Sequence, residues 1–429
     1  MNVMYSHPRD LLSDVMCLIY QLGLTTTSGG NLSILDEEGN IWITPAGVDK
    51  GSLTPKDIVM VKPNGETEGL HKPSSELPFH RAIYEARPDL KAIIHAHPPA
   101  LVSFSIVRKI PDTSALPQAQ HLCGPVGYAP YKLPGSRDLG ESIAAEFKNG
   151  YNCVIMENHG TVVGGSGILK AFQRFETLEF CARSIIKANE IGKAKFLSQE
   201  QILQFEHREN RLPEFDRQTP GSLEKQLRGD ICRFVRRACA QGLMISSYGT
   251  VSVRLSKNEF LITPTAKNRR YFQLEDIVYI RNGSRERGKL PSRAVGLHKM
   301  IYDRHENINC IISTQSSNAN AFCISGEKMD TRTIPESYIL LEDIPMLPYG
   351  SQFKGSPAIP DALNAHTPIV MIQNDSILVT GKDLLETFDR LEVAEFSARS
   401  LISATHIGEL TPIGESEIEQ LKDKFLRKK

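Results

Sequence analysis

The sequence predicts an α/β protein made of two tandem copies of one helix-covered sandwich. Three observations support this fold class. At 429 residues the chain is too long for one ordinary hydrophobic core and fits two domains of roughly 200 residues each. The two halves also repeat each other in sequence. Within each half, short apolar runs typical of buried strands, such as residues 92–94, alternate with longer segments typical of helices.

The repeat extends along both halves at an offset of about 216 to 219 residues. Matching segments are Ile-Thr-Pro at 43–45 and 262–264, Asp-Ile-Val at 57–59 and 276–278, and Glu-Phe-x-Ala-Arg-Ser at 179–184 and 395–400. Each half is expected to run as helix, short strands, helix, strand, loop, helix, strand and long helix. The polar, proline-containing segment 198–222 is expected to be a linker. We therefore place a boundary near residue 215, between a first copy (residues 1–215) and a second copy (residues 216–429).

The composition is that of an ordinary globular protein. The 50 basic and 50 acidic residues cancel, which gives no reason to expect a nucleic-acid partner. Residues 1–10 lack the features of a signal peptide, and no run approaches the roughly 18 apolar residues needed to span a membrane. The eight cysteines form no CxxC pair, which favours free thiols in a reducing compartment. We therefore expect a cytoplasmic protein with no membrane partner.

Two histidine motifs of the first copy follow predicted strands. His95-Ala96-His97 ends the apolar run that begins at residue 92, and residues two apart in a strand point to the same face. Both imidazoles could therefore bind one ion, although HxH alone is a weak signal. Asn158-His159-Gly160 follows a second apolar run, and its glycine permits a sharp backbone turn beside the imidazole.

A carboxylate stands at the start of a predicted helix. The segment 72–76 is expected to open a helix that continues to residue 86, with Ser75 as its N-cap and Pro78 in its first turn. Glu76 would then project from the helix start, where it could simply complement the helix dipole. Three imidazoles, one open coordination position and a nearby carboxylate are, together, the ingredients of a catalytic zinc site.

The repeat provides an internal control for this interpretation. At the candidate positions the second copy carries other residues: Ala294 for Glu76, Ser313 for His95, Gln315 for His97 and Asp375 for His159. Correlated loss of four scattered groups within a retained framework is what the decay of one shared site predicts. His80, in contrast, persists as His298 and is interpreted as structural. We therefore expect a metal site in the first copy and none in the second, which would be a degenerate domain without the metal ligands.

The first copy resembles the class II aldolase and adducin head-domain family, whose members include fuculose-phosphate and rhamnulose-phosphate aldolases and ribulose-phosphate 4-epimerase. The resemblance covers about 170 residues and rests on the segments 28–33, 43–47, 73–76, 92–98 and 158–160. It implies a class II aldolase-like sandwich with a central, mostly antiparallel β-sheet covered by helices. The second copy is similar to the family in its framework only, as adducin keeps the fold without the metal ligands.

The resemblance also implies a site and a chemistry. The ligands of a Zn²⁺ ion would be His95, His97 and His159, with Glu76 at the metal as a further ligand and as the catalytic base. The phosphate pocket would draw on Gly30, Asn31, Gly47, Ser74 and Ser75, although glycines 29–30 could also form a simple turn. The protein would be a class II aldehyde-lyase that cleaves a phosphorylated ketose or related sugar acid through a metal-stabilised enediolate.

One departure from the family pattern leaves the reaction open. Sugar-phosphate aldolases of this family usually carry a tyrosine acid in the loop after the HxH strand, but residues 110–124 contain no tyrosine. Tyr128 or Tyr131 could replace it. The same site would also suit an epimerase, a decarboxylase or a dehydratase, and a non-catalytic scaffold like adducin is a further alternative. Family aldolases are commonly tetramers, so we expect a homo-oligomer in which two chains form a pseudo-tetramer.

Overall fold

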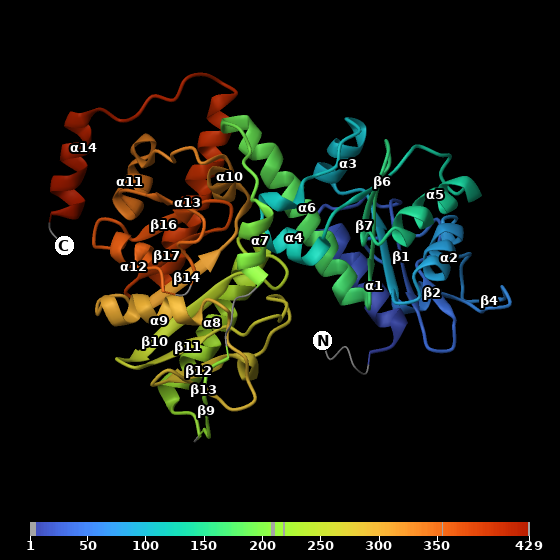
Figure 1. The fold of residues 1–429 in the computed structure, drawn as a ribbon, viewed down its shortest axis with the longest axis horizontal. Coiled ribbons are helices and arrows are strands. Elements are labelled where there is room, and N and C mark those ends of the chain that lie inside the picture. The colour runs from blue at the N-terminus through green and yellow to red at the C-terminus, as the bar shows by residue number, and fades with distance from the viewer. Residues whose placement is uncertain (1–5, 207–210, 218, 354, 428–429) are drawn as a thin grey trace. The chain divides into compact units, whose positions relative to one another are not determined.

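The computed structural model describes residues 6–206, 211–217, 219–353 and 355–427. The chain forms two compact units, one of residues 1–114 and 118–183 and one of residues 115–117 and 184–429 (Figure 1). The predicted boundary near residue 215 stays a prediction, and the linker expected at 198–222 lies partly outside the described residues. None of the described helices combines the length and the apolar composition that a membrane span requires.

The sheet of the first copy has the strand order β4-β3-β2-β1-β5-β8-β7-β6 in the part of the chain that the structure describes. All neighbouring strands are antiparallel except β6 and β7. The strands are β1 (Asn31–Leu35), β2 (Ile41–Ile43), β3 (Val59–Val61), β4 (Thr67–Glu68), β5 (Ala92–Ala96), β6 (Gly127–Ala129), β7 (Cys153–Met156) and β8 (Gly160–Gly165). The helices are α1 (Pro8–Gln21), η2 (Pro55–Asp57), α2 (Leu77–Ala86), α3 (Pro99–Ile106), η3 (Thr113–Ala115), α4 (Pro117–Cys123), α5 (Arg137–Lys148), α6 (Ile168–Ile191) and α7 (Gln199–Glu206).

A second sheet repeats this plan in the order β15-β16-β17-β14-β10-β11-β12-β13-β9. It holds the strands of the second copy and, at one edge, β9, which lies just before the predicted boundary. Only the two outermost pairs of this sheet, β15 with β16 and β13 with β9, are parallel among the described strands. The strands are β9 (Glu214–Phe215), β10 (Thr250–Ser256), β11 (Glu259–Ile262), β12 (Val278–Arg281), β13 (Ser284–Glu286), β14 (Cys310–Thr314), β15 (Met346–Leu347), β16 (Ile369–Ile372) and β17 (Ser376–Gly381). The helices are α8 (Ser222–Ala240), η4 (Leu274–Asp276), α9 (Val295–Arg304), α10 (Ser317–Ser325), η5 (Thr331–Thr333), α11 (Pro335–Leu341), α12 (Ala358–Ala362), α13 (Leu384–Thr405), α14 (Glu415–Leu421) and η6 (Lys422–Leu426). The predicted fold class, two tandem sandwiches with mostly antiparallel sheets, is confirmed.

Helices cover both faces of the first sheet. α2 and α5 pack against each other on one face, and α1 lies on the opposite face (Figure 1). Phe79 of α2, Phe147 of α5 and Ile93 of β5 belong to one buried cluster between these helices and the sheet. His95 points to the same face as Ile93 because side chains two apart on a strand share a face. The ring of His95 packs edge to face against that of Phe79 in α2, with 5.6 Å between the ring centroids. The candidate site therefore lies on the side of β5 that α2 covers.

A buried serine, histidine and tyrosine form the same hydrogen-bonded triad in both copies. In the second copy, Oγ of Ser252 lies 2.7 Å from Nδ1 of His298 and 2.7 Å from the hydroxyl of Tyr302. In the first copy, Ser33, His80 and Tyr84 repeat these contacts at 2.6 and 2.7 Å. Burial lowers the pKa of His298 to about 3, so this imidazole is neutral at neutral pH. The structural role predicted for the histidine of this pair is confirmed, because the triad joins β1 to α2 and β10 to α9.

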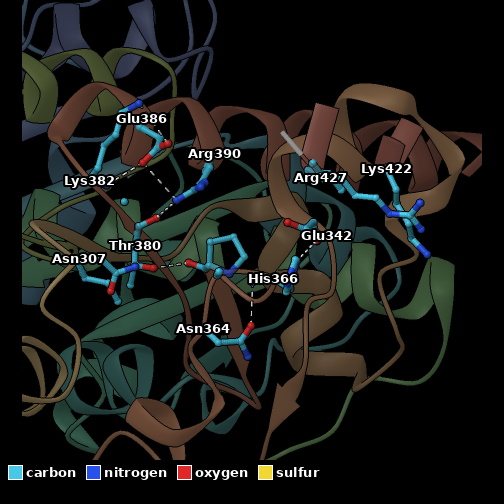
Figure 2. A pocket seen from close by; sticks show the side chains of 15 residues that line it. Asn307, Glu342, Asn364, His366, Thr380, Lys382, Glu386, Arg390, Lys422 and Arg427 are labelled. Atoms are coloured by element: carbon cyan, nitrogen blue, oxygen red, sulfur yellow. Dashed lines mark hydrogen bonds and ion pairs between the residues drawn. The ribbon is translucent and has the colours of Figure 1, made fainter. Parts of the chain in front are cut away.

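The second copy also contains a pocket of about 950 Å³ beneath its C-terminal segment, shown in Figure 2. Residues along its wall include Asn307, Thr380, Lys382, Arg390 and Lys422. It lies where β14 begins and β17 ends. The positions equivalent to the first-copy histidines stand at the opposite ends of these two strands, so the pocket is not the counterpart of the candidate site.

The triad gives a stability prediction that can be tested in the second copy, away from the candidate site. Ser252→Ala would remove the hydrogen-bond partner that Nδ1 of His298 and the hydroxyl of Tyr302 share inside the core. We expect the free energy of local unfolding to fall by about 2 kcal/mol. Hydrogen exchange of β10 and α9, followed by mass spectrometry, measures this loss.

The matched control for Ser252→Ala is Ser256→Ala at the other end of β10. Ser256 donates a hydrogen bond of 2.9 Å to Glu259 at an exposed position, where water can replace the partner. Its loss should change the free energy of unfolding by less than about 0.5 kcal/mol. Equal effects of the two substitutions would contradict a structural role for the triad.

Candidate metal centre

The pairing of β5 with β8 brings the histidine motifs together. His95 lies opposite Val162 in this antiparallel pair, and Ala96 lies opposite Thr161. The next residue on one strand, His97, therefore meets the hairpin turn that joins β7 to β8, where His159 stands. Asn158 in this turn has a φ of 53°, a left-handed conformation that asparagine tolerates better than most residues. Two motifs separated by some sixty residues in the chain thus share one end of the sheet.

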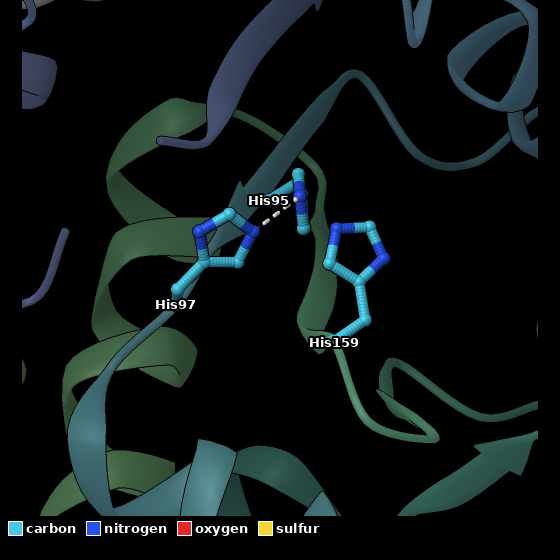
Figure 3. Close-up of side chains that lie close together, drawn as sticks. All are labelled: His95, His97 and His159. Carbon is cyan, nitrogen blue, oxygen red and sulfur yellow. Dashed lines mark hydrogen bonds between the residues drawn. The ribbon is translucent and has the colours of Figure 1, made fainter. Parts of the chain in front are cut away.

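The three imidazoles face one another (Figure 3). Their ring centroids lie 4.8 Å (His95–His97), 5.0 Å (His95–His159) and 5.1 Å (His97–His159) apart. One nitrogen from each ring falls within 4.8 Å of the others. Nε2 of His95 lies 3.2 Å from Nε2 of His97, close to the spacing of about 3.3 Å expected for two nitrogens on one tetrahedral zinc ion.

A backbone carbonyl orients His95. Nδ1 of His95 lies 3.0 Å from the carbonyl oxygen of Thr161, and a carbonyl can only accept, so Nδ1 carries the proton. Nε2 is then left with a lone pair that points at Nε2 of His97 and at Oε2 of Glu76, each 3.2 Å away. Lone pairs that converge in this way repel one another unless a proton or a metal ion lies between them. A second-shell carbonyl that fixes the tautomer is typical of histidine metal ligands.

Burial keeps the other two rings ready to bind a metal. Burial, followed by the neighbouring imidazoles, lowers the pKa of His97 to about 3. Burial and the neighbouring His95 likewise lower the pKa of His159 to about 4. Both rings are therefore neutral at neutral pH, and a neutral imidazole is the form that coordinates a metal.

Glu76 stands beside the imidazoles. Its Oε2 lies 3.2 Å from Nε2 of His95, and its Oε1 lies 3.8 Å from Nε2 of His159. Burial alone would raise the pKa of Glu76, but the positive charge of a proton on Nε2 of His95, together with hydrogen bonds from His95 and Asn31, holds this pKa well below its usual range. A metal cation at the same place would act in the same direction. The carboxylate is therefore ionised, as a base or a metal ligand must be.

The predicted start of α2 needs a correction. Ser75 was expected to cap the helix, but the helix begins at Leu77 with Glu76 itself at the N-cap position. The hydroxyl of Ser74 accepts a hydrogen bond of 3.3 Å from the amide of Glu76 and bends the chain before the helix. Glu76 makes no capping bond with its own side chain, which leaves its carboxylate directed at the histidines. Pro78 lies in the first turn, as predicted.

Two glycines that the sequence reasoning did not single out as site residues make room for His97. A Cβ atom at Gly29 would lie 2.9 Å from Nδ1 of His97, and one at Gly160 would lie 2.6 Å from its Cδ2. Neither position can carry a larger residue while this ring stays in place. The signal was available in the repeat, because the second copy, which has no histidine to accommodate, carries Tyr248 and Ser376 at these positions.

Among the residues assigned to the phosphate pocket, Ser74 and Ser75 directly precede Glu76 in the chain, and Asn31 contacts it from β1. Gly30 is buried with a φ of 73°, and a Cβ there would lie 2.5 Å from the carbonyl oxygen of His95. Gly47 is exposed and also has a left-handed φ of 70°. Pro45, just before Gly47, pairs with Pro73, just before Ser74, in an isolated β-bridge. This bridge joins the segment that carries Gly47 to the segment that carries the two serines. Ser74 is buried and Ser75 is exposed, so only the second hydroxyl opens to solvent.

Asn31 departs most from a simple pocket role. Its Nδ2 donates a hydrogen bond of 2.7 Å to Oε2 of Glu76, and its Oδ1 lies 2.5 Å from Nε2 of His80. Both ends of this buried amide are therefore engaged by protein groups. His80 is interpreted as structural from the repeat, and its contact with Asn31 has no signature in the sequence.

The two tyrosines considered as replacement acids differ in environment. Tyr128 lies in β6, where burial, followed by the carboxylate of Glu157, raises the pKa of its hydroxyl. Glu157 stands two residues before His159 and forms an ion pair of 2.8 Å with Arg108. Tyr131 lies on the following loop with more than half of its surface exposed. The assignment of an acid to either residue stays a prediction.

In the second copy, the residues equivalent to His97 and His159, Gln315 and Asp375, take part in hydrogen bonds. Nε2 of Gln315 donates a hydrogen bond of 2.7 Å to the backbone oxygen of Asp375. The hydroxyl of Ser376 bonds to the Asp375 carboxylate at 2.9 Å. Among the described residues, one group of three histidine, cysteine or acidic side chains lies close enough together to hold a metal ion, and it consists of His95, His97 and His159.

Both copies match one protein family. The family model described as "Class II Aldolase and Adducin N-terminal domain" aligns with residues 10–186 and again with residues 229–402. The two matched segments correspond to the two halves of the sequence repeat.

Three relatives illustrate the range of activities among similar proteins. A 5-deoxy-D-ribulose 1-phosphate aldolase of Bacillus thuringiensis is 36% identical over 184 residues, which is 42% of this chain and 84% of the relative. A 3-oxo-tetronate 4-phosphate decarboxylase of Pectobacterium atrosepticum is 33% identical and aligns over 43% of this chain and 85% of its own length. An L-fuculose phosphate aldolase of Methanococcus maripaludis is 34% identical, with 39% of this chain and 89% of the relative aligned.

Proposed function

Because the chain belongs to the class II aldolase and adducin N-terminal domain family, we propose that its first copy is a zinc-dependent carbon-carbon lyase. The substrate would be a phosphorylated ketose or a related sugar acid, cleaved through an enediolate. The observation that carries this proposal is the convergence of three imidazoles, with the carboxylate of Glu76 beside them. Aldolases among the similar proteins support the reaction type.

The donor set fits a catalytic zinc ion. His95, His97 and His159 would hold it, with Glu76 alongside, and three nitrogens leave a coordination position for substrate. Bound there, the metal would act as a Lewis acid that polarises the substrate carbonyl. His97 and His159 stay neutral at neutral pH, because burial lowers the pKa of each ring.

Glu76 would act as the base. It is ionised, it stands beside the substrate position, and its low exposure keeps water away from the reacting atoms. In the direction of enolate formation, its carboxylate takes a proton from the substrate carbon, and the electron pair of the broken bond stays on the substrate.

The phosphate would lie at the mouth of the site. We assign its contacts to Gly30, Gly47, Ser74 and Ser75, with Asn31 as a further candidate. Glycine permits close approach of backbone amides to an anion, and serines near the start of α2 offer donors beside the positive end of the helix dipole.

A decarboxylase is the second candidate, and one sequence feature favours it. Cleavage of a carbon-carbon bond between two sugar carbons requires proton transfer at the departing oxygen, whereas loss of carbon dioxide from a 3-oxo acid does not. The segment 110–124, where aldolases of this family place their tyrosine acid, contains no tyrosine. The similarity to a 3-oxo-tetronate 4-phosphate decarboxylase is consistent with this alternative.

The proposal predicts one zinc ion per chain. His97→Ala takes away one of the three imidazole ligands and should weaken zinc binding strongly, so bound zinc after dialysis should fall well below one equivalent. Gln315→Ala changes the equivalent position of the second copy and should leave one equivalent bound. Elemental analysis of the wild type and of the two variants measures the zinc bound per chain. A wild-type protein without stoichiometric zinc would rule out the metal-enzyme proposal.

The role of Glu76 predicts a specific loss of turnover. Glu76→Gln keeps the shape of the side chain but removes the base, so we expect turnover to fall by about 100-fold to 10,000-fold while zinc is retained. A panel of phosphorylated ketoses and 3-oxo acid phosphates, followed by release of aldehyde or carbon dioxide, provides the assay and separates the two candidate reactions. Glu85→Gln, on an exposed position of the same helix, is the control. Unchanged turnover in Glu76→Gln would exclude this residue as the base.

We also propose that the protein is a cytoplasmic homo-oligomer in which two chains form a pseudo-tetramer, with the second copy as a degenerate domain. Light scattering of the purified protein measures its mass directly. A fully active monomer would contradict the assembly.

A further inference from the structure

A buried network of four side chains leads from the core of the first copy to Glu76. Tyr84, Ser33, His80 and Asn31 are each at most 6% exposed. The contacts in order are Tyr84 hydroxyl to Ser33 Oγ (2.7 Å), Ser33 Oγ to His80 Nδ1 (2.6 Å), His80 Nε2 to Asn31 Oδ1 (2.5 Å) and Asn31 Nδ2 to Glu76 Oε2 (2.7 Å). The network ends on the carboxylate to which we assign the chemistry.

The carboxylate fixes the direction of every bond in this network. An ionised carboxylate can only accept, so Asn31 must turn its Nδ2 amino group toward Glu76 and its Oδ1 toward His80. Oδ1 also only accepts, so His80 carries its proton on Nε2 and leaves Nδ1 as an acceptor. Ser33 then donates to Nδ1 and accepts from the hydroxyl of Tyr84. Rotating the Asn31 amide by half a turn would break two buried hydrogen bonds at once, which is costly in the protein interior.

The second copy keeps the inner triad and lacks the outer link. Nε2 of His298 faces the hydroxyl of Ser313 at 3.3 Å instead of an amide. Thr250 replaces Asn31, and Ala294 replaces Glu76. Core packing therefore accounts for the part that both copies share. It does not account for an amide that the first copy alone inserts between the histidine and a carboxylate.

We propose that Asn31 is a positioning residue, locked by the buried network, that anchors Oε2 of Glu76 so that Oε1 receives the proton from the substrate. Oε2 already faces Nδ2 of Asn31 at 2.7 Å and Nε2 of His95 at 3.2 Å. Oε1 lies 3.8 Å from Nε2 of His159, beyond hydrogen-bonding distance. This inference rests on the proposed role of Glu76 as the base and assigns the reaction to one of its two oxygens.

The physical gain is preorganisation. A glutamate side chain has several rotatable bonds, and its carboxylate can turn either oxygen toward the substrate. Anchoring one oxygen removes this freedom before the substrate arrives, so the proton transfer does not have to wait for reorientation.

Proton exchange measures this role without knowledge of the aldehyde product. The zinc-loaded full-length protein is incubated with dihydroxyacetone phosphate in deuterated water, and loss of the carbon-bound proton is followed by NMR. Asn31→Ala should lower kcat for exchange by about 100-fold, the order of loss expected from a misplaced catalytic group, with little change in KM. Bound zinc should equal that of the wild type.

The repeat supplies a matched pair of controls. Ser33→Ala and Ser252→Ala remove the same hydroxyl from the same triad in the two copies and should destabilise their copies to a similar extent. If the network positions Glu76, Ser33→Ala should lower kcat for exchange by about fivefold, the net worth of one hydrogen bond, while Ser252→Ala leaves kcat unchanged. Equal kcat values for the two variants would overturn the proposal.

Two further outcomes decide against it. A rise of KM in Asn31→Ala with unchanged kcat would make Asn31 a phosphate ligand instead. NMR of ¹⁵N-labelled histidine tests the network independently of activity, since His80 must carry its proton on Nε2, and a proton on Nδ1 would overturn the assigned directions. If the wild type catalyses no exchange, the aldolase proposal fails for this substrate, and the histidine spectrum still decides whether the network is oriented as inferred.

Discussion

The antiparallel pairing of β5 with β8 is the constraint on which the site depends. Its register places His97 against the turn that carries His159, and it brings the Thr161 carbonyl to Nδ1 of His95. One pairing thus sets both the positions of the rings and the nitrogen that His95 presents. The second copy has the same pairing between β14 and β17, yet it carries no imidazoles there. The framework is therefore necessary for the site but does not create it.

The approach of Glu76 from α2 depends on a second set of contacts, which lie in the core. The serine, histidine and tyrosine triad ties α2 to β1 in one copy and α9 to β10 in the other. In the first copy this structural device also reaches the carboxylate through Asn31. Stability and catalysis would then share the same buried groups in the first copy, and the stabilising part alone is present in the second copy, which lacks the metal ligands.

Much of this organisation could be predicted from one sequence, because the duplication served as its own comparison. The fold class and the family follow from motifs whose spacing survives in both halves, and the ends of the β5 and β7 strands lie where apolar runs stop. Other features have no local signature. The carbonyl of Thr161 that orients His95 belongs to the backbone, so no residue type marks it. The need for glycine around His97 can be recognised only once the position of the ring is known. Ser75 was wrongly predicted as the helix cap, because the hydroxyl of Ser74 accepts the hydrogen bond from the amide of Glu76 and the chain bends there.

The central claim is that three side chains of the first copy share one metal ion, and anomalous X-ray diffraction from zinc-loaded crystals tests it most directly. We expect one anomalous peak per chain, about 2.0 to 2.1 Å from a nitrogen of each of His95, His97 and His159, and bound to His95 through Nε2. A peak against other residues, a peak on Nδ1 of His95, or no peak in protein loaded with zinc would contradict the account.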